Sequence, residues 1–327
     1  MGVGKLHEPY DFPRARKAIV AEVGAKELQR LHRTSRVADA LAIVGLWSVF
    51  LTLVYLLGTM EVSLLWAACF VLQGFVIMAF GYMMHELFVH RFVGGKLFSR
   101  WMGLTTGLVS KQLPTEYAHI HRSHHLYTGT DPDEQYKQDL HTRLRRWFYI
   151  TPVGYMMTLR RALKVDHPEE WPPPDGAFGQ LDERDRKSRK VDRKFQYVWG
   201  ALVVALIVLF PRATLLGYLV PLVFALPLAN GLRLVLEHGE TNPDNVYHCA
   251  TYYRTGPISR VLFFWDAGDC HLVHPLFPTI PLYRRGAATK LRRPFLKSKG
   301  VRERRSLLVL CYGFFIRNEP HRSLWSA

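Results

Sequence analysis

The sequence predicts an all-α integral membrane protein, in which four transmembrane helices form two hairpins beneath a helical cytoplasmic cap that holds a metal site. Three observations lead to this prediction. The chain has four long stretches without charged residues, its basic residues lie almost entirely outside the short turns between these stretches, and its histidines cluster in the polar segments. The 327 residues are 49% hydrophobic and carry a formal net charge of +16, so strongly apolar and strongly basic segments alternate along the chain.

The four apolar stretches are residues 40–60, 62–84, 195–211 and 213–232. A helix needs about 20 apolar residues, and at least about 17, to cross a hydrocarbon core of about 30 Å. Three of the stretches meet this length comfortably, and 195–211 lies at the limit. The connections around Glu61 and Arg212 are long enough only for turns, so the sequence predicts two hairpins whose turns lie on the same side of the membrane.

The distribution of basic residues predicts the orientation of these spans. Of the 43 Lys and Arg residues, only Arg212 lies in a predicted outer turn, and none lies within a span. Because cytoplasmic loops carry the excess of Lys and Arg, we expect both termini and the loop 85–194 to be cytoplasmic. Anionic lipid headgroups explain the positive charge, and no nucleic-acid-binding motif accompanies it, so nucleic acid is not an expected partner. A basic cytoplasmic surface would also suit an acidic redox partner.

The predicted spans belong to one membrane domain over residues 38–283, with a further segment on either side. In residues 1–37, the pattern around Lys17–Val23 is typical of an amphipathic helix that lies on lipid headgroups, so a cytoplasmic or interfacial segment is expected. Residues 284–327 are basic and are expected to be cytoplasmic. Their apolar run, Leu307–Ile316, is too short to cross a bilayer.

The fifteen histidines all lie in segments assigned to the cytoplasmic side, and eight of them are candidate metal ligands. These eight are His85, His90, His121, His124, His125, His238, His271 and His274. Side chains three or four residues apart share one face of a helix, so the 121–125 cluster and the 271–274 pair can each direct imidazoles into one volume. His85 and His90 are five apart, about 140° around an α-helix. That spacing suits either two neighbouring metals or a helix that is irregular where it leaves the membrane.

Eight imidazoles indicate two metal ions, because one zinc ion takes about four ligands. Imidazole suits iron as well as zinc. A metalloprotease is disfavoured, because its motif has two histidines four residues apart, whereas His85-Glu86 is followed by a histidine only at position 90. A membrane receptor or scaffold that binds zinc is the alternative from another functional class.

These clusters resemble the three histidine boxes of the membrane fatty acid desaturase/hydroxylase superfamily, H-x3-4-H, H-x2-3-H-H and (H/Q)-x2-3-H-H. The chain supplies His85–His90, His121–His125 and His271–His274, and the last is followed by Phe277-Pro278, as is common in that superfamily. The resemblance covers roughly residues 40–283. It implies a histidine-ligated diiron centre on the cytoplasmic side of a membrane domain.

The third box departs from the superfamily pattern at Pro275, which stands where a histidine usually completes the box. Proline offers no side-chain donor atom, so a usual metal ligand is missing. A replacement could come from Asp269, Glu237, His248 or water, and Asp269 is the leading candidate because a carboxylate suits oxidised iron. Alternatively, the substitution weakens the second metal site.

The resemblance further implies an enzyme, a non-haem diiron oxidoreductase that uses O2 to oxidise an unactivated C–H bond of a long-chain fatty acid or acyl lipid. Desaturation is the expected reaction. Hydroxylation, ketolation and oxidative decarboxylation to a terminal alkene are alternatives on the same scaffold. The cofactors would be two iron ions that cycle between Fe2+ and Fe3+, with O2 as co-substrate. Electrons would come from a separate donor, of the ferredoxin, rubredoxin or cytochrome b5 type, with its reductase.

Buried carboxylates often accept the second N–H of a metal-bound imidazole. The candidates for this role are Glu86, Glu237, Asp131, Asp133, Glu116 and Asp266. Basic side chains near the entrance to the site could hold the carboxylate or phosphate of a substrate headgroup, and the candidates are Arg91, Arg122 and Arg233.

Overall fold

Nearly all of the described chain is helical, as the sequence predicts. The structure, a computed structural model, describes residues 11–90, 96–127, 143–163, 182–238, 245–253, 256–262, 271–301, 303–304 and 307–317. Within these ranges the strands are β1 (Tyr252–Tyr253) and β2 (Glu303–Arg304), which pair in parallel. The prediction of an all-α fold is confirmed apart from this minimal sheet.

Three helical stretches of the described chain are long and apolar enough to cross a membrane, namely Arg36–Thr59, Leu64–His90 and Pro211–Leu234. They consist of α3 (Arg36–Thr59), of α4 (Leu64–Met84) with the π-helix η1 (His85–His90), and of α10 (Pro211–Thr214), η3 (Leu215–Leu219) and most of α11 (Val220–His238). Residues 195–209 of the remaining predicted span instead form the end of α9 (Glu183–Leu209), whose first half is highly charged. The four-span arrangement therefore remains a prediction.

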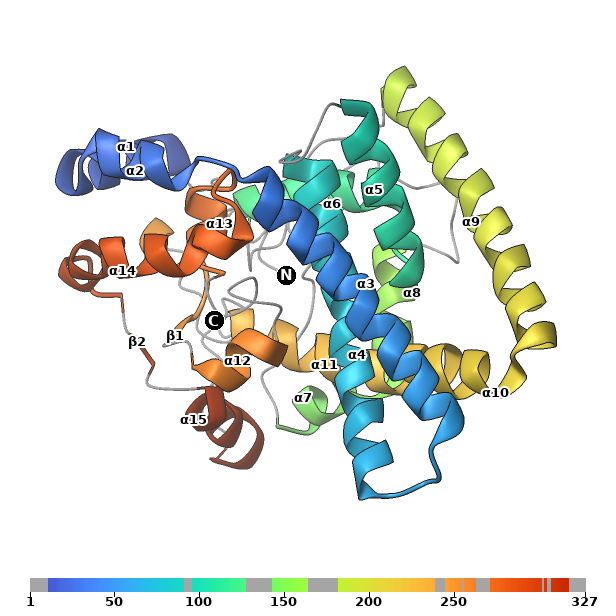
Figure 1. Cartoon of the computed structure of the whole chain (residues 1–327). Helices are drawn as coiled ribbons and strands as arrows, with labels where there is room; N and C mark the ends of the chain where they lie inside the picture. Colours follow the sequence, from blue (N-terminus) through green and yellow to red (C-terminus); the bar gives the residue numbers. More distant parts are fainter. Residues whose placement is uncertain are drawn as a thin grey trace, which may run out of the picture.

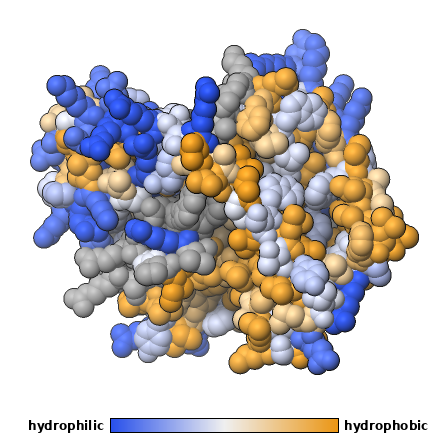
Figure 2. All heavy atoms as spheres, viewed as in Figure 1, coloured by the Kyte–Doolittle hydropathy of each residue, from blue (hydrophilic) through white to orange (hydrophobic). Residues whose placement is uncertain are grey.

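The helices α3 and α4 follow one another through a short turn and pack side by side (Figure 1). Each begins at a serine whose hydroxyl accepts a backbone N–H three residues later, Ser35 from Ala38 at 3.3 Å and Ser63 from Trp66 at 3.2 Å. Such caps satisfy N–H groups that the first turn of a helix leaves unpaired. Apolar side chains that are not used in packing face outward, and Figure 2 shows them gathered over the right and lower parts of the face in view. A surface of this kind suits contact with lipid.

The helix α4 lies at the centre of the largest core, where it packs against α3, α5 (Lys96–Val109) and α11. At Gly74 the helix α11 approaches so closely that an added Cβ would lie 2.4 Å from the backbone carbonyl carbon of Ala225. Small residues allow membrane helices to pack with their backbones in contact. Gly74 thereby sets the distance between α4 and α11, whose C-terminal ends carry His85 and His238.

A second core lies beside the membrane helices, formed by α1 (Phe12–Val23), α2 (Ala25–Leu31), α13 (Val273–Leu276) and α14 (Leu282–Ser298) (Figure 1). The apolar face of α1, with Phe12, Ala15 and Ile19, is buried in this core together with Leu276. The sequence pattern had indicated that this face lies on lipid headgroups. In the structure it is turned inward, because α13 and α14 supply an apolar surface that covers it.

The helix α6 (Pro114–Tyr127), which carries the second histidine cluster, is anchored to the charged half of α9. The buried carboxylate of Asp192 accepts the backbone N–H of Thr115 at 2.9 Å and pairs with Arg100 of α5. Glu116 pairs with Arg189 at 2.7 Å. These contacts fix the start of α6, and hence the direction in which its histidines point.

The remaining described helices are α7 (Arg143–Tyr149), α8 (Pro152–Leu163), η4 (Val246–His248), α12 (Pro257–Leu262), α15 (Leu307–Cys311) and η5 (Tyr312–Arg317). The apolar run near the C-terminus packs against α7 through its backbone. Arg146 donates to the carbonyl of Phe314 at 2.7 Å, and the Trp147 indole donates to that of Phe315 at 3.1 Å. This short run is therefore a packed helix.

Candidate metal centre

The first histidine pair lies where α4 passes into the π-helix η1. A π-helix joins residues five apart by its hydrogen bonds, so two side chains with that spacing come to the same side. The Nε2 atoms of His85 and His90 are accordingly 3.1 Å apart. Of the two explanations for this five-residue spacing, the structure shows the irregular helix.

The helix α6 divides its histidines between two places. His121 and His125 lie with the histidines of η1, whereas His124 lies with His238 at the end of α11. On an α-helix, residues 124 and 125 are separated by about 100° of rotation, so adjacent side chains diverge. The expectation that all three imidazoles enter one volume is therefore wrong.

The first histidine group consists of His85, His121, His125 and His274. The Nε2 atom of His121 lies at its centre, 2.9 Å from that of His85, 2.6 Å from that of His125 and 3.4 Å from that of His274. His90 adjoins the group, because its ring centroid is 4.6 Å from that of His85 and 4.9 Å from that of His274. Five imidazoles thus converge on one buried volume.

The second histidine group consists of His124, His238 and His271, all of them buried. The ring centroid of His238 lies 4.8 Å from that of His124 and 4.9 Å from that of His271. The two groups are neighbours, because the ring centroids of His121 and His124 are 5.5 Å apart and those of His271 and His274 are 6.0 Å apart. Each of the second and third histidine clusters contributes to both groups.

The geometry of both groups fits metal binding. Nitrogens bound at about 2.1 Å to one ion lie about 3.0–3.4 Å apart. In the first group, Nε2 of His121 lies 2.9 Å from that of His85 and 3.4 Å from that of His274, close to this range, whereas its 2.6 Å distance to Nε2 of His125 is shorter. In the second group, the buried Nε2 of His271 has no hydrogen-bond partner among the described residues. A metal ion between the three rings would coordinate this nitrogen.

Burial keeps these imidazoles neutral, which is the form that binds metals. It is the main cause that lowers the pKa of His125, His271 and His274 well below the usual range of imidazole. Neighbouring charge lowers these pKa values further, from His121 on His125, from His124 on His271 and from Arg285 on His274. Unprotonated nitrogens are therefore available at neutral pH.

Each group has a buried glutamate behind one of its histidines. In the first group, the carboxylate of Glu86 lies 3.2 Å from Nδ1 of His85 and forms an ion pair with Arg285 of α14. In the second group, the carboxylate of Glu237 lies 3.8 Å from Nδ1 of His271, and its other oxygen accepts the hydroxyl of Tyr82 at 2.8 Å. Both glutamates lie where a partner of a metal-bound imidazole would be needed.

Several residues predicted for the site lie elsewhere or outside the described ranges. Glu116 is held by α9, as described above. Arg233 is not at an entrance, because its guanidinium lies 3.7 Å from Glu237 and 5.5 Å from the centre of the Tyr82 ring. Arg122 is exposed on α6. The candidates Asp131, Asp133, Asp266, Asp269 and Arg91 and the side chain of His248 fall outside the part of the chain that the structure describes.

Three residues at the centre were not singled out from the sequence. Arg285 is 2% exposed and lies between Glu86 and His274, with 3.2 Å from its guanidinium to Nδ1 of that histidine. The ring of Tyr117 stacks on that of His121 with 5.0 Å between centroids. Tyr82 binds Glu237, as described above. Tyr117 precedes His121 by one helical turn, which was a usable signal, whereas nothing in the basic C-terminal sequence distinguishes Arg285 from its neighbours.

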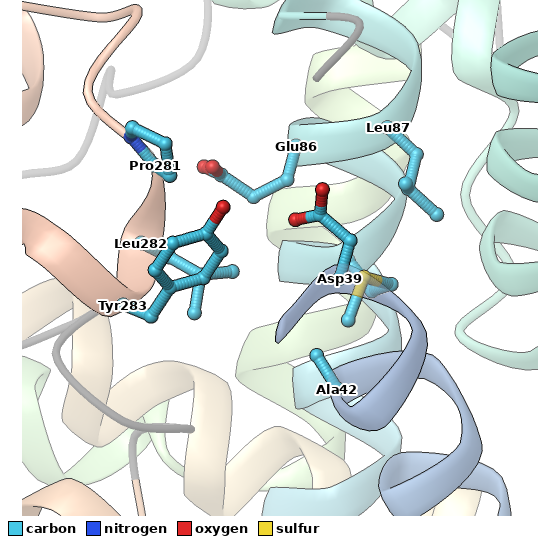
Figure 3. A pocket seen from close by; sticks show the side chains of 8 residues that line it. Asp39, Ala42, Glu86, Leu87, Pro281, Leu282 and Tyr283 are labelled. Carbon is cyan, nitrogen blue, oxygen red and sulfur yellow. The ribbon is translucent and has the colours of Figure 1, made fainter. Parts of the chain in front are cut away.

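A pocket lies beside Glu86, the residue that contacts His85 of the first histidine group (Figure 3). Asp39 of α3 and Glu86 of η1 direct their carboxylates into it, and Tyr283 of α14 directs its hydroxyl toward them. Its other lining residues are Ala42, Met83, Leu87, Pro281 and Leu282. The Oε1 atom of Glu86 contacts His85 and Arg285. Its Oε2 atom has no hydrogen-bond partner among the described residues.

Comparison with known proteins agrees with this geometry. The family model described as "Fatty acid desaturase" matches residues 61–306. The matched range includes all eight predicted histidine ligands, Pro275 and Arg285. A search of curated proteins finds no match to the chain.

Proposed function

Because the chain belongs to the fatty acid desaturase family, we propose that it uses O2 to desaturate a long-chain fatty acid or acyl lipid at an unactivated C–H bond. Membership of this family makes the protein an oxidoreductase with a lipid substrate. The observation that carries the proposal is the pair of adjacent histidine groups at the inner ends of α4 and α11. Two neighbouring nitrogen-rich sites suit a pair of iron ions.

The residues proposed to hold the iron ions are the eight histidines of the two groups, with His90 assigned to the first. When bound, the two ions supply the exchange of electrons with O2 that C–H oxidation requires. The protein contributes the placement of the ligands. Glu86 orients His85, Glu237 orients His271, and the buried surroundings exclude water from the site.

We propose that four spans anchor the enzyme, the fourth being the apolar end of α9 from residue 195 to 209. Both termini and the metal centre would lie on the cytoplasmic side, because basic residues surround the inner ends of the spans. The proposed division of the chain is a segment 1–37, a membrane domain 38–283 and a basic segment 284–327. Arg285 connects the last of these to the metal centre.

Desaturation requires a partner that delivers electrons. Removing two hydrogen atoms from the substrate while O2 is reduced to two molecules of water consumes two further electrons and two protons. We propose a separate donor of the ferredoxin, rubredoxin or cytochrome b5 type, with its reductase. The basic cytoplasmic surface would favour an acidic protein in this role.

The reaction is tested by product analysis with the purified protein. The protein in detergent is supplied with a redox donor, O2 and a set of fatty acids, acyl-CoA thioesters and phospholipids, and the products are identified by mass spectrometry. We expect an unsaturated product that needs O2 and is absent with His124→Ala. A hydroxylated, keto or chain-shortened alkene product would replace desaturation with the corresponding oxidation. No O2-dependent product from any substrate would refute the proposed function.

A further inference from the structure

The two histidine groups are of unequal size. Four imidazoles of the first group lie within metal-binding reach of one another, and His90 adjoins them. In the second group only His124, His238 and His271 meet among the described residues. If each group holds one ion, the two ions have different sets of ligands.

Helix geometry assigns the missing imidazole to the second group. His271 and residue 275 are four apart, and the backbone between them is helical, since Leu272 has φ −56° and ψ −26° and α13 follows it directly. Residues four apart share a face, so a side chain at 275 would lie on the side of His271. His274, by contrast, faces the first group. Position 275 is therefore the place of a second-group ligand, and Pro275 is buried there without a donor atom.

The same division is seen on α6, with the groups exchanged. His121 and His125, four apart, both serve the first group, while His124 serves the second. A histidine at position 275 would give the third cluster the same pattern as α6 with the groups exchanged. Residues 271 and 275 would then belong to the second group and residue 274 to the first. With proline at position 275, the second group has three imidazoles among the described residues instead of four.

We propose that the two metal sites are inequivalent: the first is an all-imidazole site that fills first, and the second is a three-imidazole site that an oxygen donor completes. The inference rests on the proposed metal binding by these histidines. Water or a carboxylate can supply the oxygen, on the side of Nε2 of His271, which has no hydrogen-bond partner among the described residues. The second ion is consequently held more weakly, and it retains a ligand that can be exchanged.

The test is an anaerobic titration of the metal-free full-length protein in detergent with Co2+, followed by visible absorption and by competition with a chelator. We expect two binding steps whose affinities differ by about tenfold or more, since even partners outside the first layer of ligands change metal affinity by about 10–100-fold. His271→Ala should abolish the weaker step and spare the stronger one. His125→Ala, the matched control in the first group, should weaken the stronger step. Pro275→His should tighten the weaker step.

Two steps of equal affinity in the wild-type protein would overturn the inference, as would loss of the stronger step in His271→Ala. These two results do not depend on whether Pro275→His folds. Equal steps together with O2-dependent product formation would refute the inequivalence alone. Unequal steps without any product would support the inequivalence and refute the proposed function.

Discussion

The pair Glu86–Arg285 shows how single buried residues define the metal centre. The two side chains are 3% and 2% exposed, and Glu86 also contacts His85, so the pair connects α14 to the first histidine group. Removing one member of a buried ion pair costs about 3–5 kcal/mol, because the remaining charge is left uncompensated. Arg285 therefore combines a role in stability with a role in placing a metal ligand.

We expect Arg285→Met to lower the stability of the protein by about 3–5 kcal/mol and to reduce metal occupancy of the first group. Thermal unfolding in detergent and metal analysis would measure the two effects. Arg285→Lys keeps the positive charge but not the planar guanidinium. It should therefore lose less stability and less bound metal than Arg285→Met. Arg284→Met is a suitable control, because the half-buried side chain of Arg284 donates to the backbone carbonyl of Arg30 at 2.9 Å rather than pairing with a buried carboxylate. Equal effects at 284 and 285 would contradict this assignment.

The buried histidines predict a pH dependence for the metal-free protein. The pKa values of His271 and His274 are lowered in the folded state, mainly by burial. The unfolded chain, with an imidazole pKa of about 6.5, therefore binds more protons below that pH. Stability should be at its full value above about pH 6.5 and should be lost as the pH falls below it.

The measurement is Tm as a function of pH for the metal-free wild type and for His274→Gln. We expect Tm to be constant near neutral pH and to fall on acidification, with a shallower fall in the variant because one titrating group is gone. A Tm that rises on acidification would show that these histidines are not buried in neutral form.

The chemistry of individual residues was only partly predictable from the sequence. Spacing singled out the clustered histidines, because three histidines within one helical turn have few structural explanations, and His238 was added because it ends a predicted span on the same side. Glu86 and Glu237 were two of the six carboxylates proposed as acceptors, and the structure places them beside His85 and His271. Arg285 was missed, because it comes from a segment about 200 residues away from Glu86 and only tertiary packing brings the two together.

At the scale of elements, the distance between α4 and α11 is the critical quantity, because their C-terminal ends carry histidines of different groups. Their approach depends on Gly74, where an added Cβ would lie 2.4 Å from backbone atoms of Ala225. No side-chain rearrangement can relieve a contact with backbone, so the helices must separate to accept it. The metal centre is thus sensitive to a residue in the middle of the membrane-spanning bundle.

We expect Gly74→Ala to destabilise the protein by about 1–3 kcal/mol, the usual cost of an overpacked core, and to reduce bound metal. Gly45→Ala on α3 is the matched control, since an added Cβ there meets nothing within 4 Å. It should be neutral or slightly stabilising, because alanine favours helix. Tm and metal content of both variants would decide the matter, and a harmless Gly74→Ala would contradict the close packing.

The sequence predicted the helices better than their irregularities and their partners. The apolar stretches correctly located α3, α4 and α11, because length and hydrophobicity suffice for such helices. The five-residue spacing of His85 and His90 left two explanations, which only the observed π-helix separated. The inward orientation of α1 was not predicted, since an amphipathic helix has the same pattern whether it covers a membrane or another helix.

At the scale of the whole molecule, the fold places two histidine groups that could hold metal ions at one end of an apolar helical bundle. Three helices of the described chain are able to span a membrane, and the end of α9 is the proposed fourth. The sequence could not decide whether residues 195–211 cross the membrane, because this stretch is close to the minimum length of a membrane-spanning helix and continues a charged helix. The metal centre also depends on side-chain packing between distant segments, which could not be predicted from the sequence.

The orientation of the molecule can be tested with epitope tags in sealed vesicles of both orientations. We expect tags at the N-terminus and the C-terminus to be accessible from the cytoplasmic side, and a tag inserted at Glu61 to be accessible from the opposite side. A tag after Arg212 should behave like the one at Glu61. If the tags at residues 61 and 212 appear on different sides, the four-span arrangement is wrong.

The central claim is that the two histidine groups hold two iron ions. It is tested most directly by elemental analysis and Mössbauer spectroscopy of protein produced with enriched iron and purified in detergent. We predict two irons per chain with the signature of a coupled pair, lost in His124→Ala. A single zinc ion per chain, or no bound iron after anaerobic reconstitution, would contradict the claim and favour a zinc-binding receptor or scaffold.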